Sequence, residues 1–250
     1  RHLVPAGWVD RATSRQIDNS DNVGSGPDWR QGYGYQFWMS RHGVRGDGAF
    51  GQFSLVLPAQ DVVIVTTACV PEMQPLLDLV WTHLLPAFGA EGSMEADAVL
   101  AQRLAGLRLT GVIEPGVVAP GGQAHGVSSP RPETACEVLD AGDDTPLPNG
   151  SLVTVTGRDE GWSVRIRTDG RWGYDVSIEV GHGRWFESRI GEAQIPVLAQ
   201  GTQMAGDRLA IDVILAETPH RFRLSCSGLQ CSAEWNAPPL SGTSLGAHLF

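Results

Sequence analysis

The glycine-rich stretch from Gly46 to Gly51 is the part of this chain whose residue types and spacing bear most directly on chemistry. Its six residues read GDGAFG and stand directly before a strand-like pattern that begins at Gln52. Glycines at such a place let the backbone approach another backbone or a ligand closely. A backbone N–H exposed there could serve an oxyanion hole. From spacing alone, however, an ordinary glycine-rich hairpin loop is the better account.

Other patterns that could carry chemistry are weaker. The segment Gly242-Thr243-Ser244-Leu245-Gly246 matches the G-x-S-x-G nucleophile motif, but no acid follows it and no room for a helix remains. We therefore expect a flexible tail there. Seven His are scattered without ligand spacing, and four Cys form no CxxC pair. We therefore expect neither a metal nor another cofactor.

Two of the cysteines, Cys226 and Cys231, flank a turn expected at Ser227–Gly228. Depending on the strand register, their side chains could face each other at bridging distance. We expect both thiols to be reduced, because so short a closed loop constrains the unfolded chain little. Residues 1–30 show no secretion signal, so a cytoplasmic location is the default expectation.

Charge and composition narrow the classes of partner. The chain has 250 residues and a formal net charge of -10, and its 18 basic side chains are all arginine. An acidic chain repels phosphate backbones, which argues against nucleic acid. Since no apolar run approaches the roughly 20 residues that span a bilayer, no membrane segment is expected. The absence of lysine excludes Schiff-base and P-loop lysine chemistry within these residues.

The first part of the chain predicts a small sheet covered by a helix. Strands are expected at residues 33–39, 52–57 and 62–67, and the last of these reads as a β-branched run covered on both faces. Apolar residues at three- and four-residue steps then predict an amphipathic helix over residues 71–88. A weaker helix is expected over residues 93–104.

The composition changes after this helix. Residues 111–132 are dominated by Gly, Pro, Ser and Ala, which is typical of a linker. From residue 133 to 236 apolar and polar residues alternate in about seven or eight short segments, which indicates a barrel or a sandwich. The expected organisation is a first domain at 1–106, a linker at 107–132 and a β domain at 133–250.

Several segments, taken in order, resemble the C-terminal part of the β-lactamase-like serine hydrolases. This family includes class C β-lactamases, related esterases, D-amino-acid-processing peptidases and nylon-oligomer hydrolases. The matching segments are YGYQFW at residues 33–38, GAFGQ at 48–52, the strands at 53–58 and 62–67, and the helix at 71–88. Residues 217–220 (ETPH) and 235–240 (WNAPPL) look like a β-rich module appended to some of these hydrolases. The resemblance implies an α+β fold, in which a remnant of the hydrolase's antiparallel sheet with its C-terminal helix precedes an all-β domain.

The resemblance also implies covalent catalysis through an acyl-enzyme. The family's nucleophile is a serine three residues before a lysine, and a tyrosine assists proton transfer. Since this chain has no lysine, we expect these groups in a missing N-terminal part of the same protein, and we expect the chain alone to be inactive. The family's third motif, often lysine-threonine-glycine, corresponds to Gly46-Asp47-Gly48, and the oxyanion-hole N–H carries over to Ala49.

The missing cation in this motif counts against penicillin-type substrates that bear a carboxylate. It favours a small ester or amide substrate, although Arg45 or Arg41 could substitute for the cation. The expected catalytic residues are therefore Ala49, Asp47 and Gly48, with substrate contacts from Gly46, Phe50 and Arg45. The alternative is a non-catalytic pair of modules in which the β domain binds a ligand or a partner.

Overall fold

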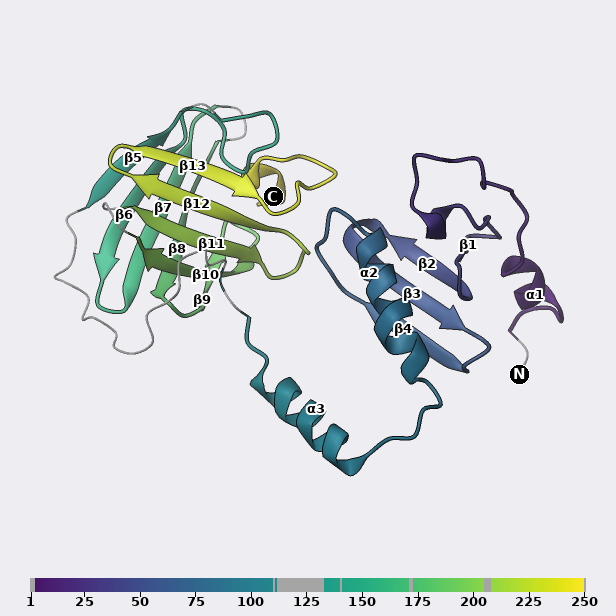
Figure 1. Cartoon of the computed structure of the whole chain (residues 1–250). Coiled ribbons are helices and arrows are strands. Elements are labelled where there is room, and N and C mark those ends of the chain that lie inside the picture. The colour runs from purple at the N-terminus through teal and green to yellow at the C-terminus, as the bar shows by residue number, and fades with distance from the viewer. Residues whose placement is uncertain are drawn as a thin grey trace. The chain divides into compact units, whose positions relative to one another are not determined.

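A computed structural model describes residues 3–109, 111, 133–139, 141–170, 173–204 and 208–249. The chain divides into two compact units, Arg1–Leu107 and Arg108–Phe250 (Figure 1). Of the linker expected at 107–132, residues 107–109 and 111 are described, and the rest lies outside the described residues. Among the described helices, none has the length and apolar character needed to cross a bilayer.

The first unit is built on a four-stranded antiparallel sheet in the order β1-β2-β3-β4. The strands are β1 (Trp38–Met39), β2 (Val44–Gly48), β3 (Gln52–Leu57) and β4 (Val62–Thr66). The helices are α1 (Trp8–Ala12), a 3-10 turn at Pro27–Trp29, α2 (Gln74–Leu79), a π-helical turn at Val80–Leu84, a 3-10 turn at Leu85–Ala87, and α3 (Met94–Gly106).

The core of this unit lies between the sheet and the helix that begins with α2 (Figure 1). Alternate residues of β3 are buried against this helix. The buried residues of the core are Phe53, Leu55, Leu57, Leu77, Val80 and Trp81. The predicted amphipathic helix is therefore present, but it starts at Gln74 with Pro75 in its first turn, where proline is tolerated. It ends in a 3-10 turn at Pro86, because proline cannot supply a further helical N–H.

Two strand predictions for this unit were wrong in extent or in exposure. The aromatic segment 33–39 is a strand only at Trp38–Met39, because Gln36 takes a φ of 68° and the N–H of Gly34 donates to the Phe37 carbonyl at 2.7 Å. The β-branched run is not covered on both faces, since Val63 and Val65 are 64% and 68% exposed. Its pattern reflects strand propensity and not burial on two sides.

The second unit is a closed barrel of eight strands. Of the two folds that the sequence predicted, a barrel or a sandwich, the barrel is the one observed. Its strands are β5 (Thr134–Val138), β6 (Leu152–Arg158), β7 (Gly161–Thr168), β8 (Tyr174–His182), β10 (Ile195–Gln203), β11 (Leu209–Leu215), β12 (Arg221–Ser227) and β13 (Gln230–Trp235). The ring runs β11-β12-β13-β5-β6-β7-β8-β10 and closes where β10 pairs with β11. A ninth strand, β9 (Phe186–Ile190), pairs with β10. The described structure is thus mostly β, and the α+β label fits it only loosely.

The segment around Ser244 is not the flexible tail that the sequence predicts. Residues Leu245–His248 form a 3-10 turn, and the Ser244 hydroxyl caps it by accepting a hydrogen bond from the N–H of Gly246. Leu245 and Leu249 are buried in the barrel's core cluster, and the N–H of Leu245 donates to the Pro146 carbonyl at 2.8 Å. The G-x-S-x-G match is therefore a packing segment of the barrel.

The expectation of reduced thiols was wrong for Cys231, which forms a disulfide with Cys136. The turn before Cys231 lies at Gly228–Leu229, one residue later than predicted. The two bridged residues are 95 apart in sequence, and a closed loop of about 100 residues stabilises the fold by about 4.7 kcal/mol in the chain-entropy view. Only the pairing of β13 with β5 brings these cysteines together, and local sequence does not reveal that pairing.

Candidate functional site

The glycine loop, residues 46–51, occupies the end of β2 and the tight connection to β3. Gly46 to Gly48 belong to β2, and Ala49–Gly51 form a short 3-10 segment that is kinked at Phe50, whose φ and ψ are not helical. Gly48 is paired with Gln52, so only three residues connect the two strands. Phe50 and Gly51 take φ values of 63° and 88°, which is the left-handed conformation that closes the turn.

Two glycines in this loop have different structural roles. A Cβ on Gly51 would lie 2.8 Å from Leu76 Cδ2 and 3.1 Å from Val70 Cγ2, and its φ is positive, so the fold requires glycine there. A Cβ on Gly46 would meet nothing closer than Ser54 Cβ at 3.8 Å. A side chain therefore fits at position 46, and the fold itself does not require glycine there.

We expect Gly51→Ala to destabilise the first unit by about 1–3 kcal/mol, because the added methyl overpacks the core at an unfavourable φ. Gly46→Ala, the matched control, is expected to change stability by about 0.5 kcal/mol or less. Hydrogen exchange of the β3 amides measures both values. Equal protection of β3 in the two variants would contradict this assignment of roles.

The edge of β2 next to this loop is open on one side. In the described ladder, β1 pairs only with Val44 and Arg45, whereas β3 pairs with all of residues 44–48. The chain leaves β1 at Gln36 and Phe37, as described above, so β1 does not continue alongside Gly46 to Gly48. An extended ligand could therefore align with this part of β2 as an additional strand.

Arg45 lies beneath the loop and has no exposed surface. Its Nη2 is 3.0 Å from Asp47 Oδ2, and its Nε donates to the same oxygen at 3.1 Å. Nη1 donates to the carbonyls of Asp28 and Met39 at 3.0 and 3.2 Å, and the guanidinium lies 4.5 Å from the centre of the Trp29 ring. Arg45 is thus a structural cation, and in this structure it does not reach a substrate as the sequence analysis suggested.

The Arg45–Asp47 pair is buried on both sides. Burial lowers the pKa of Arg45, and the charge of Asp47 opposes that shift. Burial likewise raises the pKa of Asp47, against the charge of Arg45 and a hydrogen bond with the Trp29 side chain. Only 7% of the Asp47 side chain is exposed. Asp47 therefore holds the strand end in place and is not a solvated loop residue.

Asp28 is the centre of a second buried network that sequence reasoning missed. Its carboxylate accepts hydrogen bonds from the backbone N–H and the guanidinium of Arg41, the amide of Gln74 and the indole of Trp81, over 2.8–3.0 Å. Burial raises the pKa of Asp28, but the hydrogen bonds from Arg41, Gln74 and Trp81 outweigh this and hold the pKa below its ordinary value. No local motif surrounds Asp28 that could have indicated this role.

Arg41, the other cation suggested for a substrate carboxylate, also forms ion pairs within the protein. Besides Asp28, its guanidinium pairs with Asp78, and both carboxylates raise its pKa through hydrogen bonds and charge. Its two partners belong to different segments: Asp28 lies in the 3-10 turn Pro27–Trp29 and Asp78 lies in α2. Arg41 therefore ties helix to sheet.

The structure thus places Gly46, Asp47, Gly48, Ala49 and Phe50 in one hairpin, with Arg45 beneath it. Ala49 is exposed, whereas Gly51 is buried. This arrangement can present backbone N–H groups beside an open strand edge. No family model, no curated protein and no solved structure matches this chain.

Proposed function

We propose that the first unit is the C-terminal portion of a β-lactamase-like serine hydrolase that acts through an acyl-enzyme on an ester, amide or β-lactam-like substrate. The glycine loop forms one wall of the active site, and the N–H of Ala49 supplies one of the two oxyanion-hole donors. The nucleophilic serine, its lysine base and the assisting tyrosine are supplied by a preceding part of the same protein.

This proposal rests mainly on the open edge of β2 beside the glycine loop. Gly46 to Gly48 lack side chains that would obstruct the edge, apart from the inward-held Asp47. An amide or ester that lies along this edge presents its carbonyl to the turn at Ala49. A chain segment that served only as a hairpin loop would need neither the open edge nor a glycine at position 46.

The buried networks beneath the loop support the same role. An oxyanion hole is effective only if its donors are fixed before the reaction, so that no reorganisation is needed as charge develops. Arg45, through Asp47 and the carbonyls of Asp28 and Met39, links the end of β2 to β1 and to the preceding turn. These contacts fix the strand from which Ala49 projects.

The state of the two arginines supports a substrate without a carboxylate. Arg45 is fully buried, and Arg41 is held by Asp28 and Asp78. Binding a penicillin-type carboxylate through either guanidinium would require one of these pairs to break. Neutral esters and amides require no such change.

The 250-residue chain alone is expected to hydrolyse neither chromogenic cephalosporins nor short p-nitrophenyl esters. It has no lysine and hence no Ser-x-x-Lys motif, and an oxyanion donor without a nucleophile has no intermediate to stabilise. Turnover by the pure chain that disappears on replacing one of its serines by alanine would overturn the proposal. If the coding region upstream of Arg1 contained no Ser-x-x-Lys motif, a pair of binding modules would be the better account.

A further inference from the structure

Three of the four cysteines meet at one end of the barrel. Cys136 lies on β5, Cys226 on β12 and Cys231 on β13, and their Sγ atoms are all within 4.8 Å of one another. All three side chains are buried. The first and last form the disulfide, and the Sγ of Cys226 lies 2.9 Å from that of Cys231.

The strand register gives Cys231 two potential partners. It stands directly opposite Cys226 in the antiparallel β12–β13 hairpin. On its other side β13 runs parallel to β5, which carries Cys136. Since β13 lies between β5 and β12, Cys231 is the central sulfur of the three.

We propose that these cysteines form an intramolecular thiol–disulfide exchange site in which Cys231 bonds alternately to Cys136 and to Cys226. The thiolate of Cys226 attacks the Sγ of Cys231, the bond between Cys231 and Cys136 breaks, and Cys136 leaves as the thiolate. The proton lost by Cys226 is balanced by the one that Cys136 takes up. One disulfide is broken and one is formed, so the exchange needs no external oxidant or reductant.

The exchange would change what holds the barrel closed. The β13–β5 ladder consists of two residue pairs, Gln230 with Glu137 and Cys231 with Val138. The disulfide to Cys136 bridges this short seam covalently. A disulfide to Cys226 would instead lie within the β12–β13 hairpin, and the seam would then depend on its two ladder pairs and on side-chain packing.

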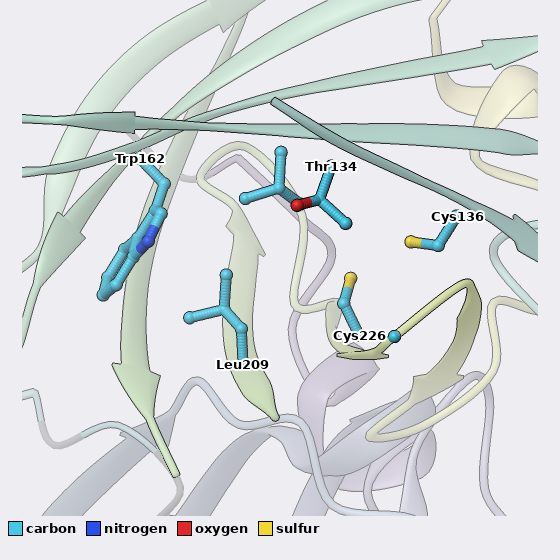
Figure 2. Close-up of a pocket in the computed structure, with 7 residues that line it drawn as sticks. Thr134, Cys136, Trp162, Leu209 and Cys226 are labelled. Carbon is cyan, nitrogen blue, oxygen red and sulfur yellow. The ribbon is translucent and has the colours of Figure 1, made fainter. Parts of the chain in front are cut away.

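A cavity of about 120 Å³ adjoins Cys136 and Cys226 (Figure 2). Besides Cys136 and Cys226 it is lined by Thr134, Val155, Trp162, Leu209 and Gly228, none of which is charged. Burial in these surroundings raises the pKa of Cys226 to about 12. The thiol is therefore protonated at neutral pH, and exchange is slow there and faster in base.

The test is disulfide mapping of the whole chain. Protein is held at neutral pH or at about pH 9, quenched with acid, alkylated in denaturant without reduction, digested and analysed by mass spectrometry. We expect the Cys136–Cys231 peptide to dominate at first and the Cys226–Cys231 peptide to grow in base, with total disulfide constant. Cys226→Ser should abolish the second species, whereas Cys69→Ser, in the other unit, should leave both unchanged.

Cys136→Ser gives an independent readout. In oxidised glutathione this variant is expected to form the Cys226–Cys231 disulfide and to lose two alkylatable thiols. If Cys226 and Cys231 both remain alkylatable in a variant with barrel-like circular dichroism, the proposal is overturned. A wild-type chain that keeps only the Cys136–Cys231 peptide in base would overturn it too. So would a wild-type chain purified with Cys136, Cys226 and Cys231 all reduced and with a stoichiometric zinc or copper ion, which would make the cluster a metal site. If Cys136→Ser fails to fold, the wild-type time course decides alone.

Discussion

Replacing Ala49 by proline in the proposed longer hydrolase is expected to lower the acylation rate by about 100- to 1,000-fold. Proline has no N–H, and removing one oxyanion-hole donor typically costs this much. The local backbone accepts the change: Gly48 is extended, at φ -117° and ψ 157°, which suits a residue before proline. Ala49 itself is the first residue of a 3-10 turn, where proline is tolerated. Single-turnover kinetics with an activated ester measure the rate.

The matched variant Ala49→Gly keeps the N–H and should keep most of the activity. The melting temperature and far-UV circular dichroism of Ala49→Pro must equal those of the parent before the rates are compared. A well-folded Ala49→Pro variant with full activity would mean that residues 46–51 are only a hairpin connection. The active-site wall would then have to lie elsewhere.

Replacing Asp28 by alanine is expected to destabilise the first unit by about 1–3 kcal/mol, the cost of leaving buried donors without an acceptor, because Arg41 is partly exposed and stays paired with Asp78. The change leaves the guanidinium of Arg41, the Gln74 amide and the Trp81 indole without their shared acceptor. Asp28→Asn should also be costly, because either orientation of its amide places an N–H against donors that now face a carboxylate oxygen. Hydrogen exchange of the β3 amides in the intact chain reports this loss, with the β11 amides of the barrel as an internal reference.

The pH dependence of this effect follows from the lowered pKa of Asp28. A carboxyl whose pKa is lower in the folded state stabilises the fold above its unfolded pKa, which is about 3.9 for aspartate. This contribution is lost as the pH falls through the lowered folded value. The stability difference between the wild type and Asp28→Asn should therefore be full at neutral pH and shrink in strong acid.

Asp21→Ala is the control for these variants, because Asp21 is exposed, and a change of about 0.5 kcal/mol or less is expected. An Asp28→Ala chain whose β3 amides remained as protected as those of Asp21→Ala would contradict the structural role of Asp28. It would also remove one of the supports for a fixed oxyanion-hole donor.

Much of the secondary structure could be predicted because local patterns determine it. The strand at Gln52–Leu57 has alternate buried residues, and the helix at Met94–Gly106 begins after the Ser93 cap. The strands of the barrel followed from their period of two. The order of the strands in the barrel could not be predicted in this way, since it includes two short parallel pairings between strands that are not consecutive, β10 with β8 and β13 with β5.

The loop that forms the candidate site could be predicted from the sequence, but the burial and the contacts of the residues around it could not. The glycines and Ala49 stand together in the sequence, so their proximity needed no tertiary information. The burial of Arg45 and Asp47 depends on Trp29, which is far away along the chain, and the network of Asp28 reaches as far as Trp81. Spacing arguments do not reveal such contacts, which is why the buried Arg45 was assigned to substrate binding.

Covalent labelling with a fluorophosphonate probe tests whether the chain is part of a serine hydrolase. The longer protein is labelled, digested and mapped by mass spectrometry alongside the 250-residue chain. We expect one labelled serine, in a Ser-x-x-Lys motif upstream of Arg1, and no label on the 250-residue chain. Replacing that lysine by alanine should remove the label. A label on a serine within the 250 residues, or an unlabelled longer protein that is fully folded, would contradict the proposal.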